Sequence, residues 1–205
     1  MLVPSIEHLG GILECRVNAW LVRRVLPERV VDTCRAIANE PLQRSLEIAP
    51  GTSIAPIVDG LPPEASETIG ADARHLTAIF LAITNRRSAQ VRLESVSCDA
   101  CRKFHVDYVR MRMLVTYAGP GTELVANGDA RREYIGRADL GFDEANRAIV
   151  PNASRVIHAR EGDIVLLKGE AFEGNAGNGA VHRSPPIEER GERRLMLKID
   201  LPGSY

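Results

Sequence analysis

The sequence predicts an α+β protein that is mainly β, with a sandwich or barrel of strands flanked by N-terminal helices. The 205 residues are enough for one domain with a large core. Apolar residues recur at helical spacing in parts of the first ninety residues, and after Asn85 they form short runs separated by Gly, Pro and Asn. We therefore expect a single domain over residues 1–205, with a helical layer at 1–90 and a β core at 91–205.

Two helices are expected in the N-terminal part. The first covers Leu26–Ala38, where apolar residues repeat at helical spacing. The stretch from Pro50 to Pro63 is rich in Pro and Gly and indicates a loop or an extended crossing. Asp72 is suited to cap the second helix. The buried stripe of that helix is expected to be Leu76, Ile79, Phe80 and Ile83.

The second part of the chain contains the expected strands. They are Val91 to Ser97, Phe104 to Ala118, Thr122 to Ala126, Arg155 to His158, Ile164 to Lys168, Ala180 to Arg183 and Arg193 to Leu201. Most are short, and turn residues separate them. This arrangement is typical of a sandwich or a barrel.

Composition argues against several classes of protein. The 26 basic and 27 acidic side chains give a net charge of -1, so the chain lacks the excess of positive charge with which nucleic-acid-binding proteins neutralise phosphates. No apolar run approaches the roughly 18 residues of a membrane span, and the N-terminus lacks a basic segment followed by an apolar one. We expect a cytoplasmic protein whose substrate is a small molecule or is unknown, with neither nucleic acid nor membrane as partner. The sequence leaves the oligomeric state open.

His105 and Asp107 are the sharpest local pair. On a strand, residues two apart point to the same face about 7 Å from each other, so an imidazole and a carboxylate can converge on one ion. A third ligand is His182, which follows a Gly-Asp turn, an apolar strand and a Gly/Asn loop. Two histidines and one carboxylate leave positions on the ion open for substrate and dioxygen. The sequence thus predicts a metal site, and with it a catalytic centre, at these three residues.

The order His105-x-Asp107, His182 and an arginine eleven residues later resembles the pattern of iron(II)- and 2-oxoglutarate-dependent oxygenases. This resemblance implies a double-stranded β-helix, that is, a cupin-like jelly-roll core with the N-terminal helices packed on it. It also implies that the triad binds Fe(II) and that Arg193 binds the far carboxylate of 2-oxoglutarate, with Arg194 in its place if the register shifts by one. A guanidinium suits this role because it pairs bidentately with a carboxylate and stays charged.

Tyr117, Arg112 and Glu123 are candidates to line the same cavity, with Tyr117 as a further contact of the cofactor. Each also suits an ordinary polar position on a strand. The chain departs from the oxygenase pattern in being short, in having only 4% aromatic residues and in showing no evident substrate lid. The substrate is therefore left unassigned.

A second resemblance covers most of the second half of the chain. The segments Cys101–Asp107, Thr116–Glu123, Leu166–Gly169 and Asn175–Pro186 resemble the bacterial family catalogued as domain of unknown function 1826. That family has no established activity. Its members tend to be found with genes of zinc homeostasis, which implies a role in the response to zinc starvation and keeps zinc open as the native metal.

Cysteines and arginines offer competing interpretations. Four cysteines, Cys15, Cys34, Cys98 and Cys101, are too few for a disulfide scaffold and are expected to be reduced. Cys98 and Cys101 could hold a zinc ion with His105 or a distant residue, form a redox pair, or simply be a buried turn. Arg86 and Arg87 suit the negative end of the second helix and need no ligand.

Three functions follow from these alternatives. The leading one is a mononuclear metal-dependent oxygenase that uses Fe(II) and 2-oxoglutarate. The second is a zinc-binding protein without catalysis, which uses the same triad or a site that includes Cys98 and Cys101. The third is a jelly-roll binding module without a metal.

Overall fold

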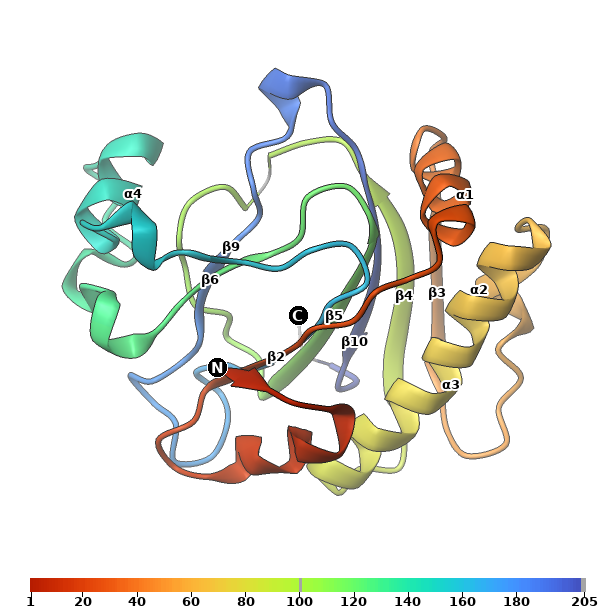
Figure 1. Cartoon of the computed structure of the whole chain (residues 1–205). Helices are drawn as coiled ribbons and strands as arrows, with labels where there is room; N and C mark the ends of the chain where they lie inside the picture. Colours follow the sequence, from red (N-terminus) through yellow and green to blue (C-terminus); the bar gives the residue numbers. More distant parts are fainter. Residues whose placement is uncertain (100, 204–205) are drawn as a thin grey trace.

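The computed structural model describes residues 1–99 and 101–203. Within these residues, the double-stranded β-helix consists of a seven-stranded sheet in the order β1-β2-β8-β5-β10-β4-β3 and a three-stranded sheet in the order β7-β6-β9. Figure 1 shows the helices α1, α2 and α3 on one side of the large sheet and the strands β6 and β9 of the small sheet on the other. The predicted class, a mainly β jelly roll with N-terminal helices packed on it, is confirmed.

The large sheet contains β1 (Leu2–Val3), β2 (Ala19–Val22), β3 (Gln43–Ile48), β4 (Ala89–Val96), β5 (Met111–Ala118), β8 (Ile164–Lys168) and β10 (Arg194–Asp200). The small sheet contains β6 (Glu123–Val125), β7 (Ile157–His158) and β9 (Val181–Arg183). The α-helices are α1 (Glu28–Ala38), α2 (Ala55–Val58), α3 (Pro63–Thr84) and α4 (Phe142–Ile149). β1 pairs with β2 in parallel, and the other pairs of the large sheet are antiparallel.

Alternation along the central strands separates two faces of the large sheet. The apolar residues that pack under the helices are Met111, Met113 and Val115 of β5 and Leu195, Leu197 and Ile199 of β10. They meet Val30 of α1 and Phe80 of α3 in the main core. The intervening residues of the same strands point toward the small sheet and form one wall of a cavity. They are Arg112, Leu114, Arg194, Met196 and Lys198.

The helices partly follow the prediction. α1 covers most of the expected segment, but α3 begins at Pro63 rather than at Asp72. Proline is well suited to the first turn because its missing N–H would lack a partner there in any case. Asp72 lies in the middle of the helix and is buried, where it accepts hydrogen bonds from Arg24 and Tyr117. The prediction that Asp72 caps the helix is therefore wrong, and α2 lies inside the expected loop.

The first ninety residues are more than a helical layer. They supply β1, β2 and β3, of which β2 pairs with β8 and β3 with β4. The expected strand from Phe104 to Ala118 begins only at Met111, and residues 104–110 are irregular apart from one bridge between His105 and His182. Across the described parts of the chain, no helix combines the length and apolar character needed to cross a membrane.

Candidate metal centre

His105, Asp107 and His182 meet at one point, although they come from distant parts of the sequence. One possible ligand atom from each residue lies within 4.8 Å of the others. Nε2 of His105 is 3.5 Å from Oδ1 of Asp107, and Nε2 of His182 is 3.4 Å from Oδ2 of the same carboxylate. Donor atoms about 2.1 Å from one ion and at right angles lie about 3 Å apart, and the distance from each histidine Nε2 to Asp107 is close to that spacing.

A two-way backbone contact brings the histidines together. The N–H of His105 donates to the carbonyl of His182 at 2.9 Å, and the N–H of His182 donates to the carbonyl of His105 at 3.0 Å. The two rings lie 4.5 Å apart, centroid to centroid. The prediction that His105 and Asp107 share a regular strand is wrong. His105 is aligned instead by this bridge to β9, and the carbonyl of Asp107 accepts a hydrogen bond from the N–H of Glu170 at 2.9 Å.

Hydrogen bonds determine which ring nitrogen of each histidine faces Asp107 and could bind a metal. Nδ1 of His105 lies 2.8 Å from the carbonyl oxygen of Lys103, and Nδ1 of His182 lies 2.9 Å from that of Ala180. A carbonyl oxygen only accepts, so each Nδ1 carries the proton and donates. With Nδ1 protonated, Nε2 is the atom of each ring that faces Asp107: in the protonated ring it donates to the carboxylate, and in the neutral ring it carries the lone pair that a metal needs.

Arg112 orients the carboxylate of Asp107. Its Nη1 donates to Oδ2 of Asp107 at 2.6 Å, while Nε and Nη2 donate to Asp200 at 2.7 Å and 3.1 Å. Burial by itself would raise the pKa of Asp107, but hydrogen bonds from His105 and His182 and the charge of Arg112 hold that pKa well below its ordinary value. Burial lowers the pKa of His105, and the Asp107 and Lys103 contacts outweigh it, so the net pKa is raised. The carboxyl group of Asp107 is thus ionised at neutral pH.

The triad opens into a cavity of about 350 Å³ between the two sheets. Other side chains that line it are Glu94, Ser95, Ser97, Cys98, Cys101, Thr122, Arg183, Ser184 and Lys198. Cys98 and Cys101 are exposed free thiols, and Ala100 between them lies outside the described residues. The cavity therefore combines a metal-type donor set with a polar wall.

Arg194 is the arginine that reaches this cavity. It is 1% exposed, and its Nη atoms make long contacts with Ser184 Oγ at 3.3 Å and Thr122 Oγ1 at 3.4 Å. Its Nε is buried without a hydrogen-bond partner among the described residues. Burial lowers the pKa of Arg194 to about 10, so the group remains charged at neutral pH. Arg193 is exposed at a different surface hollow, beside Pro41 and Leu42, and does not line the cavity of the triad, so the prediction that Arg193 reaches the cosubstrate there is wrong.

Tyr117 does not line the cavity. It is fully buried on the helix face of β5, where its hydroxyl donates to Oδ2 of Asp72 at 2.7 Å. The expectation that Tyr117 contacts a cofactor is therefore not met. Successive residues of a strand point to opposite faces, so Tyr117 points away from the face that carries Arg112 and Leu114. The spacing of these three residues in the sequence already indicates this. Glu123 also misses the cavity, because it pairs with Arg183 at 2.5 Å and His158 at 3.2 Å.

Some residues of the cavity were not selected from the sequence. Thr122 lies just before β6 and contacts Arg194, while Glu94 of β4 pairs with Lys198 of β10 at 2.9 Å. The period-two pattern places Lys198 on the same face as Arg194 and could have found it. Thr122 belongs to a turn whose direction no local pattern fixes.

Comparisons with known proteins agree with the fold. The family described as "Protein of unknown function (DUF1826)" matches residues 4–200, and a comparison with curated proteins finds no match. A putative oxygenase from Shewanella oneidensis has a TM-score of 0.50 and 12% identity, over 98% of this chain and 88% of its own. JOX2, solved in complex with 2OG, Fe and JA, has a TM-score of 0.52 and 10% identity, over 98% of this chain and 73% of its own. At such identities the likeness establishes the shared fold.

Proposed function

Because this chain belongs to the DUF1826 family of proteins of unknown function, we propose its function from its own site: a metal-dependent oxygenase that uses Fe(II) and 2-oxoglutarate. One observation carries the proposal. Two histidines with free Nε2 atoms and an ionised carboxylate face one point, in the same cavity as a buried guanidinium that lacks an acidic partner among the described residues.

The donor set fits ferrous iron. Two imidazoles and one carboxylate on one side of an ion leave the opposite positions for other ligands, as in non-haem iron oxygenases. Arg112 donates to Oδ2 of Asp107, and Oδ1, which faces Nε2 of His105, accepts no bond from that guanidinium. The carbonyl oxygens of Lys103 and Ala180 accept hydrogen bonds from Nδ1 of His105 and His182, which orients Nε2 of each ring toward Asp107. When bound, the ion and the 2-oxo acid would supply the oxidising chemistry.

Arg194 fits the cosubstrate. A buried cation is costly unless an anion pairs with it, and the long contacts to Ser184 and Thr122 are weak compensation. A dicarboxylic acid could chelate the ion with its oxo-acid end and place its far carboxylate on this guanidinium. The cavity of about 350 Å³ is within the size range of small-molecule sites.

The remaining side chains position substrate and exclude water. Leu114 and Met196 form an apolar part of the wall, and Glu94 and Lys198 form an ion pair at its side. The oxygenase fold of the solved structures supports this assignment by analogy, and the JOX2 complex holds both 2OG and Fe.

A non-catalytic zinc-binding protein is the second candidate. The observation in its favour is that Cys98 and Cys101 line the same cavity as the triad. Zinc accepts thiolate, imidazole and carboxylate ligands, so one of these thiols could complete a closed four-ligand site. Such a site would suit a role in zinc homeostasis.

Metal analysis of protein purified under reducing, anaerobic conditions tests the two candidates. The oxygenase proposal expects one iron per chain and a visible charge-transfer band that appears only when 2-oxoglutarate is added. His105→Ala and Asp107→Ala should lose both. Stoichiometric zinc that is lost on Cys98→Ser would favour the zinc protein. If no metal is retained and His105→Ala leaves the melting temperature unchanged with or without added ions, the metal-free binding module stands.

A further inference from the structure

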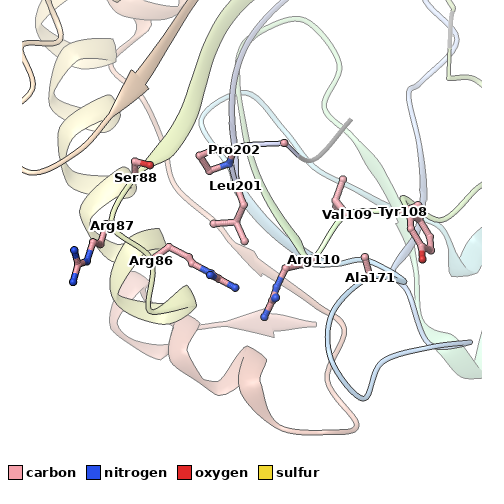
Figure 2. Close-up of a pocket in the computed structure, with 10 residues that line it drawn as sticks. Arg86, Arg87, Ser88, Tyr108, Val109, Arg110, Ala171, Leu201 and Pro202 are labelled. Atoms are coloured by element: carbon pink, nitrogen blue, oxygen red, sulfur yellow. The ribbon is translucent and has the colours of Figure 1, made fainter.

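A second hollow lies away from the candidate metal centre. Its volume is about 550 Å³, and it shares no lining residue with the metal cavity. Three segments build it, after α3, before β5 and after β10, together with Ala171 (Figure 2). Its lining residues are Arg86, Arg87, Ser88, Tyr108, Val109, Arg110, Ala171, Leu201, Pro202 and Gly203.

The charge of this pocket is positive. Within residues 1–99 and 101–203, no carboxylate lies within 4.0 Å of the guanidinium nitrogens of Arg86, Arg87 or Arg110. The acidic side chain bonded to its lining is Glu47, which accepts a hydrogen bond from Ser88 at 2.6 Å. Three cations with so little compensation make the pocket an attractive place for an anion.

Two of these arginines converge. Figure 2 shows the side chains of Arg86 and Arg110 extending into the same opening below Leu201, whereas Arg87 turns outward. Like charges that face each other repel unless an anion lies between them. The expected position of Arg86 at the negative end of α3 would need no ligand, but the field of the helix fades within the last turn. The helix ends at Thr84, and the Arg86 side chain extends toward Arg110 instead.

Apart from Ser88, the rest of the pocket is mainly apolar. Leu201 and Val109 are buried; Figure 2 shows Leu201 above Arg86 and Arg110, and Tyr108 stands at the far end with 84% of its surface exposed. A large aromatic ring left in solvent beside a cationic pocket is suited to cover a flat ligand group. The pocket therefore offers an anion site at one end and a stacking surface at the other.

We propose that this pocket binds a small phosphomonoester that carries an aromatic group, with the phosphate between Arg86 and Arg110 and the ring toward Tyr108. A phosphate group carries about -1.5 to -2 charges at pH 7 and three strong acceptor oxygens, which match two guanidinium forks better than one carboxylate does. The volume of about 550 Å³ suits a ligand of nucleotide size.

Backbone contacts hold the pocket in shape. The N–H of Gly169 donates to the carbonyl of Arg110 at 3.1 Å, and the N–H of Ala171 donates to that of Val109 at 3.2 Å. The segment with Tyr108 and Arg110 is thereby fixed to the end of β8. A site that is already ordered loses little conformational entropy on binding.

Isothermal titration calorimetry in a phosphate-free buffer tests the proposal, with adenosine 5′-monophosphate as the probe and with inorganic phosphate and adenosine as partial ligands. We expect the nucleotide to bind, more weakly at higher salt, and adenosine not to bind. Arg86→Ala and Arg110→Ala should each raise its Kd about tenfold or more, because each removes a charge-assisted contact. Arg87→Ala, the matched control, should change the Kd by less than about twofold, since its side chain turns outward.

Further variants separate the parts of the site. Tyr108→Ala should weaken binding of the nucleotide and leave that of inorganic phosphate unchanged. His105→Ala should bind the nucleotide as the wild type does, so the result does not depend on the metal centre. Arg86 and Arg87 are exposed and Arg110 is half-buried, and unchanged melting temperatures without ligand will show that the variants fold.

Three results would overturn the proposal. They are absence of nucleotide binding at millimolar concentration, equal affinity for adenosine, and an effect of Arg87→Ala as large as that of Arg86→Ala. The last would indicate a diffuse field rather than a site.

Discussion

At the scale of single residues, Arg193 and Arg194 show how one step along a strand decides a role. Leu195, Leu197 and Ile199 face the helices, so Arg194 lies on the opposite face with the cavity. Arg193 precedes β10 and stays in solvent. The motif spacing favoured Arg193, but the alternation of the strand favours Arg194.

Substitution of Arg194 should separate cosubstrate from metal. We expect Arg194→Ala to keep iron and to raise the Kd of 2-oxoglutarate by about tenfold to a hundredfold, the range expected for a lost charge-assisted hydrogen bond. Anaerobic titration of the charge-transfer band measures both properties. Arg193→Ala is the control and should behave as the wild type. Unchanged cosubstrate affinity in both variants would remove the assigned anchor.

Cys34 offers a test of burial through its pKa. Burial, with a smaller contribution from Glu161, raises the pKa of the Cys34 thiol to about 12, so the folded protein contains almost no Cys34 thiolate at pH 8. Iodoacetamide should therefore label the exposed Cys15, Cys98 and Cys101 and spare Cys34. In urea all four should react. Equal labelling rates for all four thiols in the native protein would contradict this packing.

At the scale of elements, the end of β8 supports the irregular segment that carries Asp107. Gly169 follows β8, and a Cβ at this position would overlap the carbonyl oxygens of Val109 and Asp107. The N–H of the next residue, Glu170, donates to the carbonyl of Asp107 at 2.9 Å. Only a residue without a side chain lets the two segments lie this close.

Replacement of Gly169 should therefore weaken metal binding, because it moves the backbone that carries Asp107. We expect Gly169→Ala to displace the Asp107 segment and to lower iron affinity about tenfold or more, as loss of ligand support does in metal sites. Anaerobic metal titration gives the affinity, and circular dichroism checks the fold. Gly128→Ala is the matched control, since its Cβ would meet no atom within 4 Å. Wild-type affinity in Gly169→Ala would show that this close approach does not position Asp107.

Elements with a strong local pattern could be predicted from the sequence, and those set by distant partners could not. The apolar run of β8 and the helical repeat of α1 are visible in the chain. Asp72 looks like a cap because nothing local reveals that Arg24 and Tyr117 bind it inside α3. Likewise, the triad could be chosen by residue type, but the backbone bridge that joins His105 to His182 depends on the folded sheets.

At the scale of the whole molecule, the candidate metal centre lies where the small sheet meets the large one. His182 lies on β9 of the small sheet, and Asp107 is tied through Arg112 to Asp200 at the end of β10 in the large sheet. His105 stands between them on the segment before β5. An ion at this point would therefore bridge the two sheets of the jelly roll.

Metal binding should consequently stabilise the entire fold. A ligand that binds only the native state at a free concentration of 100 Kd adds about 2.7 kcal/mol, which for a chain of this size raises the melting temperature by roughly 5 to 10 °C. Anaerobic differential scanning calorimetry with Fe(II) measures this shift, and hydrogen exchange should slow both in β9 and in residues 104–110. His182→Ala should abolish both effects, whereas the exposed His75→Ala on α3 should retain them. An equal shift in His182→Ala would mean that the ion binds elsewhere, and protection in only one of the two segments would mean that it does not join the sheets.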